Sequence, residues 1–296
     1  MVVDEKIKSC AIILNYNGEA YIEKTINSLL NQTLVPHIVV VDNFSIDKSV
    51  ELIEKKYRVV ELIKNDRNYN FGKAYNMAIQ KRKEEYIFLF NNDMIVEKNS
   101  IKNVVEYMEK NEDIGAVSFI GYGSNEKLSY PWHGDFFVKK RFGIDLKTEF
   151  TFNSPDDKPG DTLAIFGGAC CIRRCIFDSI QFDEDFSWYF EDADLGWMIN
   201  NRTEYKTKVL PNAVVIHLGG IAMKERFSMK ERDMMNYRNS FLSFMKNATY
   251  KQLLIALPEM FYFFLFQKNK IELAKLMLKK FKNERYPAKQ RKRKNA

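Results

Sequence analysis

Polar and acidic side chains follow four successive apolar stretches, and their types suit the binding of a polar ligand. The stretches end in Asn15-Tyr16-Asn17, Asp42-Asn43, Asn65-Asp66 and Asn91-Asn92-Asp93. Asn and Asp are also common in turns and at helix N-termini, so any one of these ends alone has a ready structural explanation. Four such ends in one chain favour a ligand site.

The chain has no glycine-rich phosphate loop. Neither G-x-G-x-x-G nor G-x-x-x-x-G-K-[ST] follows an apolar stretch, which disfavours a dinucleotide-dependent dehydrogenase and a P-loop NTPase. A bound diphosphate would need another source of positive charge, and the simplest is a divalent cation held by a carboxylate such as Asp93. Oxygen ligands suit Mg²⁺ and Mn²⁺ equally, so the residues do not distinguish the two metals.

The elements that must position these residues alternate along the first 120 residues. Strand-length apolar segments occupy 10–16, 37–43, 58–65, 86–93 and 114–120, and segments of helical period occupy 20–32, 48–57, 73–83 and 100–111. This alternation predicts an α/β fold with a Rossmann-like, mostly parallel sheet and helices on both faces. Ligands bind beyond the carboxyl ends of such strands, where all four polar clusters are expected to lie.

The positive net charge of +7 is concentrated at the C-terminus. From Lys268 onward there are 12 basic and 2 acidic residues, a net +10, so the preceding 267 residues carry about −3. A nucleic-acid enzyme is more often basic throughout, and no nucleic-acid partner is expected. With 46% hydrophobic residues, the 296-residue chain can bury the core of one or two domains.

The cysteines and the apolar segments indicate a cytoplasmic protein. The four cysteines, Cys10, Cys170, Cys171 and Cys175, show no C-x-x-C pair or zinc spacing, and we expect all four to be small buried residues of strands. The N-terminus shows no apolar signal segment. The longest apolar run, residues 253–266, is short for a membrane span and contains Pro258 and Glu259.

Four motifs taken in order resemble the inverting family 2 glycosyltransferases of the GT-A fold, in the subgroup often labelled rhamnosyltransferase-like. They are AIILNYNGEAYIEKTINSLLNQT, VVVDNFSIDKSVELI, LFNNDMIV and WYFEDADLGWMI. The resemblance runs from about Cys10 to His217 and more weakly to YRNSFLSFMKN. It implies a GT-A domain over residues 1–225, with a nucleotide-binding part over 9–120 and an acceptor and catalytic part over 121–225, followed by a helical extension over 226–296.

The resemblance also implies an activity. A metal-dependent enzyme of this family moves a sugar from a nucleotide-diphosphate donor to a hydroxyl of a glycan or polyprenyl-linked acceptor, in cell-surface polysaccharide or glycoconjugate synthesis. Direct displacement with inversion needs a base for the acceptor's proton, and Asp192 matches the family's catalytic base. Asp93 matches the carboxylate that binds Mg²⁺ or Mn²⁺, and Asp42 matches the acid that holds the nucleotide base.

Further site residues follow from the same resemblance and from the polar ends of the apolar stretches, and Trp132 is added because its irregular segment could border the acceptor. The predicted donor site comprises Asn15, Asn17, Asp42, Asn43, Ser45, Asn68, Asn76, Asn91 and Asn92, the metal site Asp93 and His217, the catalytic pair Glu191 and Asp192, and the acceptor contacts Asp194, Trp188 and Trp132. His217 closes an apolar strand before paired glycines, where a ligand role and a structural role fit equally by position, and the resemblance favours the ligand role. For Asp194 a helix N-terminal role is an equal alternative to acceptor contact, because acids favour the first turn of a helix.

Departures from the family pattern leave the donor sugar open. The family's glycine-rich N-x-G-F-A-x-G-N-N-x-G reads NYNFGKAYNMAI here, with Asn70, Tyr75 and Ala78 at altered positions. The arginine common after the Glu-Asp motif is absent, and Met198 stands near its place. A protein of the same fold that binds sugar nucleotides or serves as a scaffold without catalysis is the alternative function. Nucleotidyl transfer is disfavoured, because no basic loop follows the first strand.

The C-terminal part suggests attachment to a surface. An apolar, aromatic-rich run over 253–266 precedes the basic cluster, and such a combination can lie on an anionic membrane as a peripheral protein. The equal alternative is that the apolar run packs on the catalytic domain or on a second copy of the chain, with the basic tail in solvent.

Overall fold

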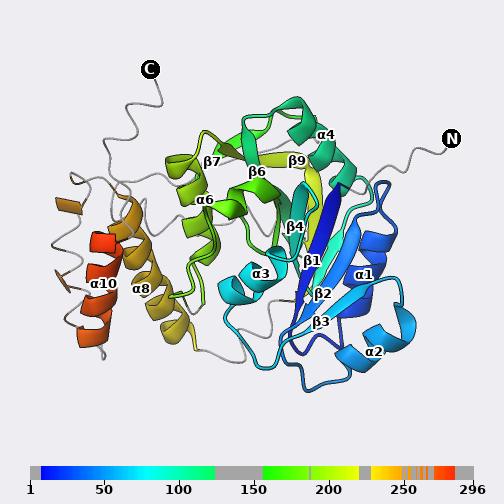
Figure 1. Cartoon of the computed structure of the whole chain (residues 1–296), viewed down its shortest axis with the longest axis horizontal. Coiled ribbons are helices and arrows are strands. Elements are labelled where there is room, and N and C mark those ends of the chain that lie inside the picture. Colours follow the sequence, from blue (N-terminus) through cyan, green and yellow to red (C-terminus); the bar gives the residue numbers. More distant parts are fainter. Residues whose placement is uncertain are drawn as a thin grey trace.

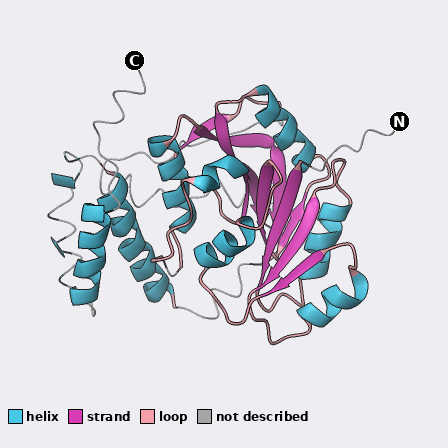
Figure 2. Ribbon diagram, viewed as in Figure 1, coloured by secondary structure: helices cyan, strands magenta, loops and turns pink. Residues whose placement is uncertain are grey.

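The computed structural model describes residues 8–123, 156–186, 188–219, 228–248 and 270–283, together with residues 250, 253, 254, 258, 261, 262 and 265. Within them a nine-stranded sheet carries helices on both faces (Figures 1 and 2). The strands are β1 (Ser9–Asn15), β2 (His37–Asp42), β3 (Glu61–Lys64), β4 (Tyr86–Asn91), β5 (Met94–Val96), β6 (Ile114–Gly123), β7 (Gly160–Thr162), β8 (Ala169–Arg173) and β9 (Lys206–His217). The helices are α1 (Ile22–Leu30), α2 (Ser49–Lys56), α3 (Phe71–Ile79), α4 (Ser100–Lys110), the 3₁₀ helix η1 (Arg174–Asp178), α6 (Glu191–Arg202), α8 (Met229–Asn247) and α10 (Lys270–Asn283).

The predicted α/β fold is confirmed, and the strands and helices predicted for the first 120 residues all form with ends shifted by a few residues. Strands β3, β2, β1 and β4 lie side by side in parallel, so their carboxyl ends share one rim of the sheet. The connections between them contain α1, α2 and α3, as parallel neighbours require. Apolar β-strand residues therefore place the four polar clusters along the same rim.

Beyond β4 the sheet is mixed. Strand β8 pairs antiparallel with both β4 and β6, and β9 pairs parallel with β6. The described sheet thus contains four parallel and four antiparallel pairings, more antiparallel ones than the α/β alternation predicts. Because β8 runs opposite to β4, its first residue Ala169 lies opposite Phe90, at the carboxyl end of β4.

Alternate residues of the central strands contribute their side chains to two hydrophobic cores, one on each face of the sheet. Ala11 and Ile13 face the core that contains α1, α2 and α4, whereas Cys10 and Ile12 face the core that contains α3, η1 and α6. Both faces of β1 are therefore covered, as in sheets with helices on each side. Three cysteines are buried in strands as predicted, but Cys175 is exposed, because it lies in η1 after the chain has left the sheet.

A third apolar core joins the C-terminal helices to α6. It includes Phe190 and Trp197 from the α6 side, Phe241 and Phe244 from α8, and Leu273 from α10. Figure 1 shows α8 and α10 side by side, with α6 between them and the sheet. Helix α10 and part of residues 226–254 are therefore packed on the predicted catalytic part. Within the described residues, the structure contains no helix with both the length and the apolar character of a membrane span.

Candidate active site

Three parts of the chain meet at the carboxyl-end rim of the sheet. The first consists of the ends of β1, β2 and β4. The second is the Gly167-Gly168 turn that leads into β8, where the Asn91 backbone N–H donates to the Gly168 carbonyl at 3.0 Å. The third is the end of β9, where His217 lies opposite Met94. Residues far apart in sequence thus surround one rim.

Asp42 lies at the end of β2 in a network of neutral donors. Asn15 Nδ2 donates to Asp42 Oδ1 at 2.9 Å, and the Ser45 hydroxyl donates to the same oxygen at 2.5 Å. The Ser45 backbone N–H donates to Oδ2 at 3.0 Å. Asn15 and Asp42 are buried. The network fixes the carboxylate in one orientation without a cation, which suits recognition of a polar group by hydrogen bonds.

Asn43 joins the end of β2 to the loop before α3. Its Nδ2 donates to Asn68 Oδ1 and to the Tyr69 carbonyl, both at 2.8 Å, and its Oδ1 accepts from Asn65 Nδ2 at 2.9 Å. Asn68 therefore belongs to the same cluster as the predicted donor residues at the end of β2. The sequence marks Asn65 only as a strand end, yet in the structure it supports Asn43 directly.

The loop after β1 passes very close to the loop after β4. Asn92 Nδ2 donates to Asn15 Oδ1 at 2.9 Å, and a Cβ atom on Gly18 would lie only 2.3 Å from that same nitrogen. Asn17 adopts the left-handed backbone conformation, with φ of 50°, and its Oδ1 accepts from the Ile46 N–H at 2.9 Å. The need for glycine at position 18 was not predicted, although Asn17-Gly18 is a typical turn pair.

Asp93 and His217 lie side by side. His217 Nε2 is 3.0 Å from Asp93 Oδ2, and both side chains are partly exposed. A Cβ atom on Gly219 would lie 2.5 Å from Asp93 Oδ2, so the glycine leaves room beside that oxygen. A carboxylate oxygen and an imidazole nitrogen at one exposed point fit a divalent cation such as Mn²⁺ or Mg²⁺.

Glu191 and Asp192 begin α6, and the Asp192 carboxylate faces the Gly167-Gly168 turn. The Gly167 N–H donates to Asp192 Oδ2 at 2.9 Å, and the Ala193 N–H donates to Oδ1 at 2.7 Å. A Cβ atom on Gly168 would lie 3.0 Å from Asn91 Nδ2, so this turn links Asp192 to the Asn91-Asn92-Asp93 segment. The glycine pair is a site feature that sequence reasoning missed, and the signal was GG directly before the apolar run ACCI.

Burial perturbs both carboxyl groups of this pair. It raises the pKa of Asp192 to about 6, although the backbone N–H groups of Gly167 and Ala193 oppose the shift. Burial together with the neighbouring Asp192 charge raises the pKa of Glu191 to about 8. Glu191 Oε2 is buried and has no hydrogen-bond partner in the described structure. Asp192 is therefore the member of the pair that ionises first and can accept a proton near neutral pH.

Two predicted site residues have structural partners instead. Asp194 is fully buried and is bound by Lys246 Nζ at 2.5 Å, so the prediction that it contacts the acceptor is wrong. Asn76 pairs with the Phe182 backbone, donating to its carbonyl at 2.9 Å and accepting from its N–H at 3.1 Å. This buried amide links α3 to a distant loop and is not available to a nucleotide. The acceptor role of Trp188 stays a prediction, and Trp132 lies outside the described residues.

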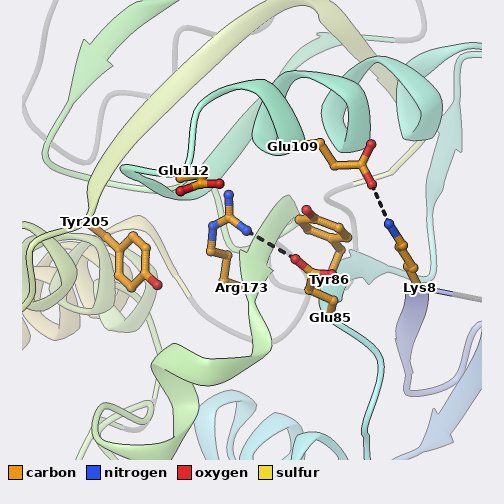
Figure 3. A pocket seen from close by; sticks show the side chains of 7 residues that line it. All are labelled: Lys8, Glu85, Tyr86, Glu109, Glu112, Arg173 and Tyr205. Atoms are coloured by element: carbon orange, nitrogen blue, oxygen red, sulfur yellow. Dashed lines mark hydrogen bonds and ion pairs between the residues drawn. The ribbon is translucent and has the colours of Figure 1, made fainter.

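The opposite, amino-end rim of the sheet holds a cavity of about 340 Å³. It is lined by Lys8, Glu85, Tyr86, Glu109, Glu112, Arg173 and Tyr205 (Figure 3). The Arg173 guanidinium donates to the carbonyls of Ile114 and Met108 at 2.8 and 2.6 Å. The Arg173 guanidinium is thus occupied by backbone carbonyls at the start of β6 and near the end of α4. This indicates a structural role for this wall of the cavity.

Paired charges also fill the rest of that rim. His37 Nδ1 lies 2.6 Å from Glu84 Oε1, and its Nε2 lies 3.3 Å from Glu61 Oε2. Arg82 donates to both oxygens of Glu61 at 2.8 Å. Cys10 completes a group that has the composition of a metal site, but burial raises the pKa of its thiol to about 12. His37, Glu61, Arg82 and Glu84 thus pair with one another, which indicates a structural role for this group.

Comparison with known proteins places the chain among glycosyltransferases. The model of glycosyl transferase family 2 matches residues 10–180. An uncharacterized glycosyltransferase of Haemophilus influenzae is 31% identical over 204 residues, which cover 64% of this chain and 61% of that protein. An uncharacterized glycosyltransferase of Methanocaldococcus jannaschii is 30% identical over 227 residues, which cover 70% of this chain and 76% of that one. This chain thus spans less than two thirds of the Haemophilus protein.

Two solved structures share the fold. Staphylococcus aureus TarS residues 1–349 in complex with UDP-GlcNAc matches with a TM-score of 0.61 and 16% identity, covering 93% of this chain and 81% of that one. GalNAc-T7 with UDP, GalNAc and Mn²⁺ matches with a TM-score of 0.54 and 18% identity, covering 72% and 43%. At these identities the likeness concerns the fold alone.

Proposed function

Because this chain belongs to glycosyl transferase family 2, and so is a nucleotide-sugar-dependent glycosyltransferase, we propose that it transfers the sugar with inversion at the anomeric carbon. The donor is a nucleotide-diphosphate sugar, and the acceptor is a hydroxyl of a glycan or polyprenyl-linked glycan in cell-surface polysaccharide or glycoconjugate synthesis. The observation that supports this most is Asp192, a buried carboxylate with a pKa raised to about 6 that the Gly167-Gly168 turn links to the Asn91-Asn92-Asp93 segment.

In this proposal Asp192 accepts the proton of the acceptor hydroxyl. The hydroxyl oxygen forms a bond to the anomeric carbon while the bond from that carbon to the diphosphate oxygen breaks, and the nucleoside diphosphate leaves. The N–H groups of Gly167 and Ala193 hold the Asp192 carboxylate in place. Glu191 retains its proton near neutral pH, since its pKa is raised to about 8, and a neutral neighbour lets Asp192 carry the negative charge alone.

Donor binding would involve both sides of the rim. Asp42, oriented by Asn15 and Ser45, is proposed to contact the nucleotide base, with Asn43 shaping the same loop. Asp93 and His217 are proposed to hold Mg²⁺ or Mn²⁺. When bound, such a cation neutralises the charge that develops on the leaving diphosphate. The solved structure of GalNAc-T7, which shares this fold, contains Mn²⁺ together with UDP, and this supports the assignment.

The test is an incubation of the purified protein with a panel of nucleotide sugars, including UDP-N-acetylglucosamine and dTDP-rhamnose, with Mn²⁺, Mg²⁺ or a chelator. We expect one donor to be hydrolysed slowly without acceptor, and released nucleoside diphosphate measures the rate. The stereochemistry of a transferred sugar, read from its anomeric proton coupling, tests inversion. Binding of the nucleotide sugars without turnover under any condition would instead support the non-catalytic alternative.

We further propose that the C-terminal helices rest on an anionic membrane. The described side chains Leu254, Phe261, Tyr262 and Leu265 are 48–68% exposed. Their spacing of seven, one and three residues in the sequence is typical of the apolar side of an amphipathic helix. The basic residues that follow add about 1 kcal/mol each near anionic lipid. A membrane surface matches both these exposed apolar side chains and the net +10 of residues 268–296.

Vesicle flotation tests the membrane proposal. Full-length protein should float with vesicles that contain phosphatidylglycerol and should stay with the soluble fraction when only phosphatidylcholine is present. Phe261→Ser/Tyr262→Ser and removal of residues 284–296 should each weaken flotation, whereas removal of all of 268–296 is a poor test because Lys280 in α10 is buried against Asp183. Equal flotation of all these proteins at low and high salt would contradict the proposal, since charge attraction is screened by salt.

A further inference from the structure

The backbone directly before the catalytic pair is strained. Tyr189 and Phe190 have φ of 68° and 72°, so two consecutive residues with side chains adopt the left-handed conformation. Such a conformation costs free energy and persists only where surrounding contacts impose it. This strained turn leads the chain into α6 and sets the direction in which the side chains of Glu191 and Asp192 point from the first turn of the helix.

Helix α8 supplies contacts that impose this turn. Asn239, which is fully buried, donates from Nδ2 to the carbonyls of Trp188 and Tyr189, both at 2.7 Å. Its Oδ1 accepts from Arg238 at 2.7 Å, which fixes the orientation of the amide. One side chain of α8 thus holds the two peptide groups that precede Phe190.

The same helix also holds the chain after the pair. Asp194 Oδ1 accepts from Ser243 Oγ at 2.6 Å and from Asn247 Nδ2 at 2.8 Å, and Lys246 Nζ lies 2.5 Å from Oδ2. All three partners belong to α8. Asp194 is two residues after Asp192, in the first turn of α6, so this cluster sets the rotation and height of that turn.

Lys246 contacts both ends of the segment from Asp183 to Asp194, which contains the catalytic pair. Its ammonium lies 2.8 Å from Asp183 Oδ2 as well as 2.5 Å from Asp194 Oδ2, and its side chain is only 2% exposed. Burial pushes the pKa of Asp183 up, but the ammonium groups of Lys246 and Lys280 outweigh it and lower that pKa to about 2. A single buried cation therefore ties together both ends of the segment that contains the catalytic pair.

We propose that α8 is the positioning element of the catalytic pair, acting through Asn239 on the strained turn before it and through Lys246 on the two aspartates that flank it. This inference rests on the proposed function and extends it to residues outside the family-matched region, which ends at residue 180. Asn239 and Lys246 are positioning residues, because their contacts are to Trp188, Tyr189, Asp183 and Asp194 and not to the rim residues that would bind donor.

The test compares Asn239→Ala and Lys246→Met with two matched controls in the full chain. Asn236→Ala removes an amide from the same helix, and Lys275→Met removes an exposed lysine of α10. Both positioning variants should lower kcat by about a hundredfold, the scale of a small misplacement of a reacting group, while KM for the donor stays within about twofold. Both controls should keep wild-type values. Wild-type kcat in Asn239→Ala and Lys246→Met would overturn the inference.

Amide hydrogen exchange provides a reading that needs no substrate. Exchange over residues 188–194 should become about tenfold faster or more in both variants, with β1 and β4 unchanged. If Lys246→Met fails to fold, the double variant Asp194→Asn/Lys246→Met takes its place in both measurements. The double variant removes one buried charge of each sign, so no buried charge is left without a partner at this point. Unchanged exchange over 188–194 would overturn the inference by itself, whereas a wild-type protein that transfers no sugar would count against the proposed function alone.

Discussion

The carboxyl groups of Glu61 and Glu84 at the amino-end rim pair with Arg82 and His37, whereas burial dominates at Glu191 and Asp192 at the carboxyl-end rim. At the amino-end rim, bonding to Arg82 lowers the pKa of Glu61, and although burial pushes the pKa of Glu84 up, His37 and backbone donors outweigh it and lower that pKa. At the carboxyl-end rim, burial raises the pKa of both Glu191 and Asp192, and only neutral backbone donors oppose the shift at Asp192.

This difference separates structural from functional charge. A carboxylate that is paired in the folded state stabilises it, whereas one that is buried without a cation lowers the free energy of unfolding once it ionises. Groups of the second kind gather at sites where a proton must be transferred or a ligand cation must bind. The amino-end rim holds the cavity of about 340 Å³, yet Lys8 there is paired with Glu109 and Arg173 with Glu85, so we assign the chemistry to the other rim.

The largest expected effect comes from exchanging a carboxylate for its amide on each rim. Asp192→Asn removes the proton acceptor and should lower kcat by about 10²–10⁴-fold with little change in donor affinity. Glu84→Gln at the amino-end rim should leave kcat unchanged. Steady-state rates of nucleoside diphosphate release measure both. If Asp192→Asn keeps near wild-type kcat, the base lies elsewhere and the distinction between the rims loses its main support.

The pH dependence of the wild-type rate sharpens the same point. Asp192 must be ionised to accept a proton, and its pKa is raised to about 6, so kcat should fall as pH drops through about 6. An unperturbed aspartate would lose activity only near its ordinary value of 3.8. A rate that stays constant down to about pH 4.5 would contradict the assignment of a buried, unpaired base.

The next effect concerns the cation. Asp93→Ala removes the proposed oxygen ligand, and donor binding should weaken by at least about 10-fold and lose its sensitivity to chelator. Glu84→Gln, which removes a carboxylate of similar exposure from the other rim, 16% against 13% for Asp93, should leave donor affinity and its metal dependence unchanged. Calorimetric titration with a nucleotide sugar, with and without Mn²⁺, measures both. Chelator-sensitive binding by Asp93→Ala equal to the wild type would remove Asp93 from the metal site.

Local sequence patterns were enough to predict the part of the site that is formed by the ends of the parallel strands. Apolar runs of strand length ending in Asp42 and Asp93, each followed by a helical segment, imply parallel neighbours whose ends meet at one rim. Hydrophobic periodicity and chain connectivity are both readable along the sequence. The structure accordingly places Asp42, Asn43 and Asn15 within hydrogen-bonded reach of one another.

The part of the site around Asp192 and Asp194 depends on contacts between distant segments, for which the local sequence carries little signal. Strand β8 enters next to β4 from the opposite direction, so the approach of Gly167 to Asp192 is a consequence of tertiary packing alone. Asp194 has the sequence context of any helix N-terminus, and its partner Lys246 lies 52 residues later. A buried polar group takes whichever partner the fold brings to it, and composition does not specify which one.

Two glycines, one near each rim, give an effect of intermediate size. A Cβ atom on Gly167 would lie 2.8 Å from Asp192 Cβ, and one on Gly115 would lie 2.5 Å from Tyr205 Cβ beside the amino-end cavity. Both Gly167→Ala and Gly115→Ala should lower the thermal midpoint, because overpacking typically costs about 1–3 kcal/mol. Only Gly167→Ala should also lower kcat of the folded protein, by about tenfold, since it displaces the base. Equal kcat for the two variants would show that the turn does not position Asp192.

The smallest effect is on stability, and it should have opposite pH dependence at the two rims. The pKa of Glu191 is raised from 4.5 to about 8 on folding, so its contribution to stability is full below about pH 4.5 and is lost as pH rises toward 8. The pKa of Glu84 is lowered, so its contribution is present above the ordinary value of 4.5 and is lost as pH falls below it.

Glu191→Gln should therefore raise the thermal midpoint relative to wild type at about pH 8 and not at about pH 5. Glu84→Gln should lower the thermal midpoint at about pH 8 and progressively less below about pH 4.5. Each kcal/mol corresponds to roughly 2–4 °C in a domain of this size, which scanning calorimetry resolves. If Glu191→Gln destabilises the protein at alkaline pH as Glu84→Gln does, Glu191 has a cationic partner when folded, and the two rims do not differ in the way they hold charge.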